Sequence, residues 1–225
     1  MLKKISLLCK ILVIILAILG VTLSMVFSAD DGYSHPTKRL FYFTGQSNIW
    51  IAVCFILILL LPLSRRYQRS DRAKNFLYIL KYIFTISITL TGFIFCAVLA
   101  PGAKNDGYNA WTLSSILTHI IVPVLSITDF FLDGYKITLK RIHIIYTMLP
   151  PFLYLVFASI LGASGFDFGR GDTFPYFFLN YASPAGFFGF SSEMPYIIGS
   201  FYWILIMLGI ILGIGALYRR LYNKR

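Results

Sequence analysis

Charged residues are scarce in this sequence. They make up 13% of the 225 residues, against roughly 25% in an ordinary soluble domain, while apolar residues make up 58%. The mean hydropathy is +0.76. This composition excludes a disordered chain and disfavours an ordinary soluble domain. Because a membrane-spanning helix needs about 20 apolar residues, the chain has room for several such helices and little else.

The sequence also lacks the signatures of common catalytic and metal sites. It contains no Gly-x-Ser-x-Gly elbow, Walker loop, His-Glu-x-x-His motif or paired-cysteine metal spacing. Its three cysteines, Cys9, Cys54 and Cys96, lie in or beside apolar segments, which argues against a disulfide framework. We therefore expect neither a metal nor a cofactor.

Six apolar segments have the length that crosses about 30 Å of hydrocarbon. The first follows Lys3 and Lys4, as in a signal peptide, but it is too long for the usual apolar region and lacks small residues at both cleavage-determining positions. We interpret it as a retained helix. The sequence thus predicts one all-α, six-helix transmembrane domain over residues 1–225, with spans at Ile5–Phe27, Phe43–Leu63, Phe76–Ala100, Trp111–Leu132, Ile142–Leu161 and Pro195–Leu217.

The basic residues indicate the orientation of these spans. Fifteen of the 20 Lys and Arg fall on one side of a six-span chain, and Lys and Arg accumulate on the cytoplasmic side. We expect both termini in the cytoplasm, Lys81 snorkelling to the inner edge of its span, and no nucleic acid as a partner. The opposite side carries Asp30, Asp31, Asp106, Asp167, Asp172 and Glu193 against Lys38, Arg39, Lys104 and Arg170.

The long outer linker Ser164–Met194 is rich in aromatic residues. Because aromatic side chains favour the membrane interface, and irregular backbone at membrane depth must lie against protein or a wet cavity, two interpretations stay open. The linker is either a lid over an outward-facing pocket or an aromatic belt at the interface. Its rings belong to Phe166, Phe168, Phe174, Tyr176, Phe177, Phe178, Tyr181, Phe187, Phe188 and Phe190.

Two stripes of polar residues lie in the outer halves of apolar spans, where polar groups are costly and often functional. At helical spacing Thr44, Ser47 and Asn48 share one face of the second span. Thr112, Ser115 and His119 share a face of the fourth span, one turn before Pro123. In the alternative interpretation, such Ser and Thr residues only bind carbonyls or pack helices.

Thr44 and His119 form the candidate pair of nucleophile and base. A threonine hydroxyl needs a base within hydrogen-bond reach to become a nucleophile, and a neutral histidine has a suitable pKa near pH 7. Counted from the span ends, the two residues differ in depth by about 9 Å, which helix tilt or a shifted span must close. Asp129 lies about 15 Å deeper than His119, and we expect it to pair with Lys81 or Lys140.

These residues also resemble a known family. Three motifs are similar to those of bacterial six-pass proteins related to the animal androgen-induced gene 1 family, and the likeness runs along nearly the whole chain. Gly45 and Asn180 depart from the residues common in bacterial relatives. The motifs are Tyr42-Phe43-Thr44-x-Gln46-Ser47-Asn48, then His119-x-x-Val122-Pro123 followed by Asp129, and Phe174-Pro175-Tyr176-x-Phe178-Leu179-Asn180.

The resemblance implies a membrane threonine hydrolase that cleaves fatty acid esters of hydroxy fatty acids, with Thr44 as nucleophile and His119 as base. We expect an integral protein of the bacterial plasma membrane whose partners are membrane lipids or a lipid-like ester. The alternative is a non-catalytic membrane protein that binds lipid, transports or scaffolds. The expected substrate-binding residues are Gln46, Ser47 and Asn48, which include candidate oxyanion donors, together with Ser115, Tyr176 and Asn180.

Overall fold

The computed structural model describes residues 1–225 apart from 31, 103–108, 170 and 225 and the side chain of Arg66. Several residues counted in the charge balance, namely Asp31, Lys104, Asp106, Arg170 and Arg225, therefore lie outside the described residues. The described chain is helical, and its β contacts are two isolated bridges, Gly169 to Asp172 and Phe190 to Ile198.

The helices follow one another with short connections. In chain order they are α1 (Leu2–Val26), η1 (Pro36–Phe41), α2 (Phe43–Leu60), η2 (Leu61–Leu63), α3 (Arg65–Gln68), α4 (Asp71–Ile94), η3 (Phe95–Leu99), α5 (Ala100–Gly102), α6 (Leu113–Ile116), η4 (Leu117–Ile121), α7 (Val122–Leu132), α8 (Ile142–Tyr146), α9 (Leu149–Ala163), η5 (Phe177–Leu179) and α10 (Ser200–Lys224). The segments η3 and η4 are π-helical, whereas η1, η2 and η5 are 3₁₀ helices.

The prediction of six spans is confirmed: within the described residues six helical stretches are long and apolar enough to cross a membrane. The predicted starts that differ most from the observed ones are those of the third and sixth stretches, and the sixth also ends at Lys224 instead of Leu217. The third stretch begins at Asp71 instead of Phe76, because the Ser70 side chain caps the helix by accepting a hydrogen bond from the Ala73 N–H. The sixth begins at Ser200 instead of Pro195. The stretches are Leu2–Val26, Phe43–Leu63, Asp71–Gly102, Leu113–Leu132, Ile142–Ala163 and Ser200–Lys224.

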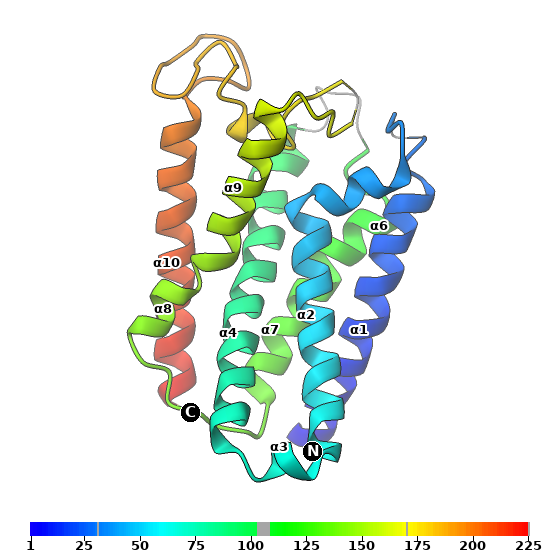
Figure 1. The fold of residues 1–225 in the computed structure, drawn as a ribbon, viewed down its shortest axis with the longest axis vertical. Coiled ribbons are helices and arrows are strands. Elements are labelled where there is room, and N and C mark those ends of the chain that lie inside the picture. Colours follow the sequence, from blue (N-terminus) through cyan, green and yellow to red (C-terminus); the bar gives the residue numbers. More distant parts are fainter. Residues whose placement is uncertain (31, 103–108, 170, 225) are drawn as a thin grey trace.

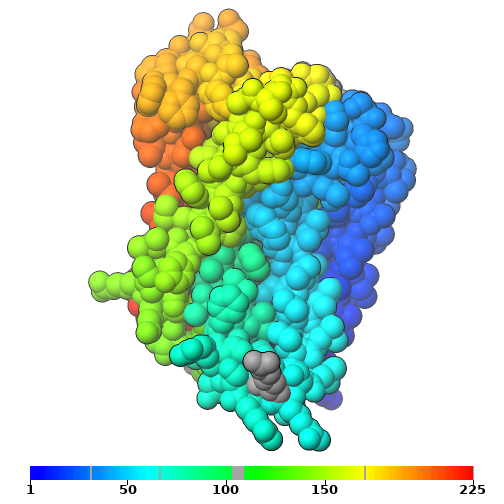
Figure 2. Space-filling view, viewed as in Figure 1, coloured from blue at the N-terminus to red at the C-terminus, as the bar shows by residue number. Residues whose placement is uncertain are grey.

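The helices form a bundle in which α4 is central. Helices α1, α2, α4 and α7 pack on one another, while α9 and α10 contact the other side of α4 more sparsely. Helices α9 and α10 diverge from each other along the bundle, and both chain termini lie at one end of it (Figure 1). We call that end the terminal end and the opposite one the loop end. In the space-filling view, α9 runs obliquely across the face between α10 and α2 (Figure 2).

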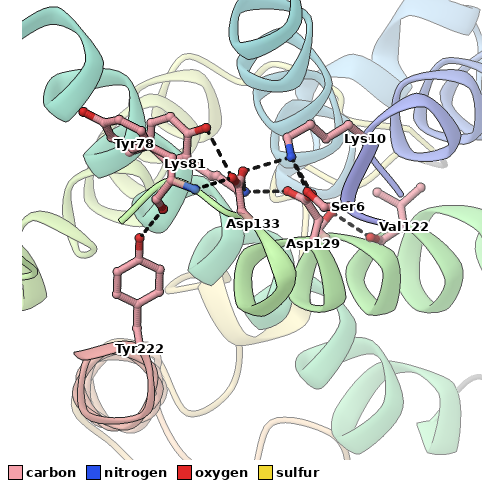
Figure 3. Close-up of polar contacts among 10 residues, drawn as sticks. Ser6, Lys10, Tyr78, Lys81, Val122, Asp129, Asp133 and Tyr222 are labelled. Carbon is pink, nitrogen blue, oxygen red and sulfur yellow. Dashed lines mark hydrogen bonds and ion pairs between the residues drawn. The ribbon is translucent and has the colours of Figure 1, made fainter. Parts of the chain in front are cut away.

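A cluster of buried charges joins three helices near the terminal end (Figure 3). Asp129 of α7 lies 2.7 Å from the Nζ atom of Lys10 in α1 and 2.6 Å from that of Lys81 in α4. Asp133 pairs with the same two lysines at 2.9 and 2.6 Å. Burial opposes charge on Asp133, but Lys81 and Lys10 outweigh it and lower its pKa to about 2.

The predicted pairing of Asp129 with Lys81 is confirmed, but the expectation that Lys81 snorkels was wrong. Lys81 is only 1% exposed and Lys10 only 5%. Two carboxylates inside the bundle hold these ammonium groups, since a buried charge needs a partner more than it needs the membrane edge. Lys10 and Lys81 thus act as structural links between helices.

The aromatic linker Ser164–Met194 divides into two parts. In the first part the rings of Phe168, Phe174 and Phe178 are buried. In the second part Phe188 and Phe190 are 63% and 71% exposed at the loop end of α10. The first part packs onto the bundle, as expected of a lid, whereas the second projects its rings outward.

Candidate active site

Thr44 is the second residue of α2, at the loop end of the bundle. Tyr42 precedes the helix in an extended conformation and gives it no side-chain cap. The first backbone N–H groups of a helix have no partners within it and carry partial positive charge. Thr44 therefore presents its hydroxyl from a position that favours negative charge.

The Thr44 Oγ1 atom lies 3.1 Å from Nε2 of His119. On its other side the imidazole places Nδ1 3.0 Å from the backbone oxygen of Ser115. Because a carbonyl oxygen only accepts hydrogen bonds, Nδ1 of a neutral His119 carries the proton. Nε2 is then the acceptor, and the Thr44 hydroxyl donates to it.

His119 lies within the π-helical segment η4, and Pro123 explains part of that geometry. Proline has no N–H, so the carbonyl of residue i−4, which is His119, is released from the helical ladder. Gly92 of α4 lies directly beside it: a Cβ at position 92 would lie 2.7 Å from the His119 oxygen. Helix α4 can approach the histidine backbone this closely because residue 92 has no side chain.

Ser47 and Asn48 bind the backbone behind the pair. The Asn48 amide donates to the carbonyls of Thr44 at 2.8 Å and Thr118 at 3.1 Å, which joins α2 to the segment that carries His119. The Ser47 hydroxyl contacts the Thr44 carbonyl and the Thr91 hydroxyl. Both side chains are fully buried. The contacts of Ser47 and Asn48 thus hold the backbone that positions Thr44 and His119.

Thr44 lies where two cavities meet, and Leu99 and Tyr176 line both cavities with it. The first cavity, of about 440 Å³, lies towards the loop end and is the more polar of the two, so we call it the polar cavity. It is lined by His119, Ser115 and Asn180 among others, and the first part of the aromatic linker covers it with residues that include Phe174 and Phe177.

The second cavity, of about 280 Å³, is almost wholly apolar. It extends from Thr44 between α4, α9 and α10, where Leu155, Met207 and Ile211 line it. Phe152, another lining residue, is 58% exposed on the bundle surface. This cavity therefore follows the cleft between the two diverging helices α9 and α10.

Tyr176 connects the aromatic linker to Thr44. Its hydroxyl is in hydrogen-bond contact with both the side chain and the backbone of Thr44. Burial raises the pKa of Tyr176 to about 12, although these contacts oppose the rise. The phenol consequently stays protonated at neutral pH.

The structure thus gathers most of the sequence-predicted site residues and separates a few. Ser115, Tyr176 and Asn180 line the cavities, whereas Gln46, Ser47 and Asn48 are not among the lining residues. Thr112 caps α6 by accepting from the Ser115 N–H. Sequence reasoning missed several residues that shape the site, namely Gly92, Phe95 and Tyr154. For Gly92, the signal in the sequence was a glycine in the middle of an apolar span.

Comparison of the chain with protein-family models, with curated proteins and with solved structures finds no match.

Proposed function

We propose that this protein is an intramembrane hydrolase of lipid acyl esters, with Thr44 as the nucleophile and His119 as the general base. The observation that carries the proposal is the 3.1 Å contact between Thr44 Oγ1 and His119 Nε2, with Nδ1 held on the Ser115 carbonyl. A nucleophile, a base within reach and a group that orients the base are the three parts that covalent ester hydrolysis requires.

The reaction follows from these contacts. Thr44 Oγ1 attacks the ester carbonyl carbon while His119 takes the hydroxyl proton on Nε2. The tetrahedral intermediate collapses, and His119 returns the proton to the departing alcohol oxygen. Water then attacks the acyl-threonine with His119 as base again, which releases the carboxylic acid and restores Thr44.

The two cavities support a lipid substrate. An acyl chain fits the apolar cavity between α4, α9 and α10, because removal of methylene groups from water is favourable by about 0.8 kcal/mol each. The polar cavity takes the alcohol part of the ester. Since both cavities meet at Thr44, a bound ester presents its carbonyl to the hydroxyl. The resemblance to the androgen-induced gene 1 family supports a fatty acid ester of a hydroxy fatty acid.

The charge distribution supports a plasma-membrane orientation in which the terminal end faces the cytoplasm. Exposed basic residues are concentrated there, on α1 and around α3 (Lys3, Lys4, Arg65, Arg69 and Arg72). In that orientation Thr44 and His119 lie towards the outer leaflet, and the aromatic linker faces the outside.

The test uses detergent-purified full-length protein and a fluorophosphonate probe that reacts with activated hydroxyl nucleophiles. We expect labelling of the wild type, loss of labelling in Thr44→Ala and His119→Ala, and partial retention in Thr44→Ser. Thr128→Ala is the matched control, because the Thr128 hydroxyl only bonds the Val124 carbonyl of its own helix. Unchanged labelling of a folded Thr44→Ala variant contradicts the proposal and favours a non-catalytic lipid-binding or transport role.

A further inference from the structure

The side chain of Tyr154 carries a buried hydroxyl that has no well-formed hydrogen bond. Tyr154 lies in the middle of α9 and is 5% exposed. Among the described residues its Oη atom makes no hydrogen bond of good geometry, and its polar neighbours are the Tyr176 hydroxyl and the Phe43 backbone. A buried hydroxyl without a partner is destabilising, and such groups are rare in native structures unless they have another use.

The ring of Tyr154 is fixed beside the nucleophile. It packs edge-on against Phe43, the residue before Thr44, with ring centroids 5.2 Å apart. It also contacts the ring of Tyr176 at 6.3 Å. Tyr154 and Thr44 line the same apolar cavity. The unsatisfied hydroxyl therefore belongs to the wall of the cavity that would hold the acyl chain.

The other hydroxyls of this cavity are already engaged. Thr91 bonds Ser47 and the carbonyl of Ser87, and Tyr176 is in contact with Thr44. Among the sequence-predicted oxyanion donors, the Asn48 amide is held by two backbone carbonyls. Tyr154 is thus a buried hydroxyl in this wall that gives up no well-formed hydrogen bond when it donates to a ligand.

An acyl ester needs such a donor at this point. When Thr44 Oγ1 bonds to the carbonyl carbon, the π-electron pair moves onto the carbonyl oxygen, which becomes an oxyanion. A positioned donor stabilises that charge most effectively where water is excluded. A phenol is protonated at neutral pH and is able to donate. It keeps its proton throughout, since His119 carries the proton of Thr44.

We propose that Tyr154 is a further catalytic residue, whose hydroxyl donates a hydrogen bond to the ester carbonyl oxygen and to the oxyanion formed on attack by Thr44. This inference rests on the proposed hydrolase function, and it assigns a substrate contact to a buried cavity hydroxyl that has no well-formed hydrogen bond within the protein.

The experiment compares Tyr154→Phe with wild type in the purified full-length protein, by the rate of fluorophosphonate labelling and by the thermal midpoint. Tyr154→Phe keeps the ring and removes only the hydroxyl. We expect the labelling rate constant to fall about 10²-fold, while the thermal midpoint stays equal to or above that of wild type, because no well-formed protein hydrogen bond is lost.

The matched control is Tyr181→Phe, whose hydroxyl donates to the Ser159 carbonyl at 3.0 Å and which lines neither described cavity. We expect it to lower the thermal midpoint and leave the labelling rate unchanged. Wild-type labelling of Tyr154→Phe, with Thr44→Ala unlabelled, overturns the role of Tyr154 and leaves the hydrolase proposal intact. A thermal midpoint of Tyr154→Phe that falls as far as that of Tyr181→Phe also overturns it, since the hydroxyl is then structural. Equal labelling of Thr44→Ala and wild type contradicts the proposed hydrolase function, and the role of Tyr154 is then overturned with it.

Discussion

The imidazole of His119 lies flat against the ring of Phe95, with centroids 4.1 Å apart and planes inclined by 19°. Both residues belong to π-helical segments, Phe95 at the start of η3 and His119 in the middle of η4. Single-turn π-helices within α-helices are rare and frequently occur at functional sites. Here two of them face each other, and the stacked pair fixes the plane of the histidine ring that faces Thr44.

Replacement of Phe95 by Leu should therefore slow labelling of Thr44 by the fluorophosphonate probe more than it destabilises the fold. Without the flat aromatic surface, the imidazole of His119 is free to rotate away from Thr44, and we expect labelling to slow by about ten-fold. Phe84→Leu is the control. Phe84 lies in the same helical span as Phe95, but it stacks on Trp50 of α2 and not on His119. Equal labelling rates in the two variants would show that the stacking has no catalytic value.

Substitution of Gly92 by Ala should separate α4 from the histidine segment. The new Cβ would lie 2.7 Å from the His119 carbonyl oxygen and 3.3 Å from Pro123, so we expect a loss of about 1–3 kcal/mol in unfolding free energy from overpacking. Gly209→Ala in α10 meets nothing within 4 Å. It should be neutral or stabilise by up to about 1 kcal/mol. Thermal unfolding in detergent measures both, and a Gly92→Ala variant as stable as wild type contradicts the close approach.

Replacement of Asn48 by Ala should leave the Thr44 and Thr118 carbonyls without their shared donor. Each buried group left unpaired costs about 1–3 kcal/mol, and the two helices lose the link that sets the Thr44–His119 distance. We expect kcat for a lipid ester to fall with KM nearly unchanged. Asn75→Ala is the control, since Asn75 only accepts an exposed hydrogen bond from Tyr135. A selective rise in KM would instead place Asn48 in contact with substrate.

Removal of one carboxylate from the charged cluster should destabilise the bundle strongly. In Asp129→Ala two buried ammonium groups lose a partner, and breaking a buried ion pair in this way costs about 3–5 kcal/mol. Asp71→Ala removes an exposed partner of Lys74 and should change stability by less than about 0.5 kcal/mol. Thermal midpoints of the two variants that agree within error would show that the cluster contributes little.

Membrane orientation is testable with single cysteines at the two ends of the bundle. Ser164 and Ser64 are both exposed, after α9 and before α3 respectively. With the terminal end in the cytoplasm, a membrane-impermeant maleimide applied to intact cells should label Ser164→Cys and not Ser64→Cys, with the unsubstituted chain as background. The reverse pattern would invert the proposed topology.

The six spans were predictable because length and hydropathy determine what crosses a membrane. The residues at which these spans begin and end were harder to predict. Helix α4 extends through Arg72 and Lys74 because nothing forces a helix to stop where the hydrocarbon does, and its Ser70 cap sets the start. The start of α10 was misplaced because the apolar character of residues 195–199 does not distinguish an ordered turn from a helix.

The candidate pair was visible in the sequence, but its geometry was not. Thr44 and His119 stood out because few polar groups lie in the spans, yet residue counting placed them about 9 Å apart in depth. That count assumes parallel helices with common starting depths. The pairing of Lys81 with Asp133, the stack on Phe95 and the buried hydroxyl of Tyr154 depend on which helices are neighbours, which no local pattern encodes.

Under the proposed hydrolase function, the position of Thr44 between an apolar and a polar cavity gives the two products different exits. The fatty acid would be released into the cleft between α9 and α10 and would return to the lipid, while the alcohol would leave through the polar cavity beneath the aromatic linker. With separate exits, neither product has to pass the other. An enzyme of this form would keep turning over while one of its products accumulates in the bilayer around it.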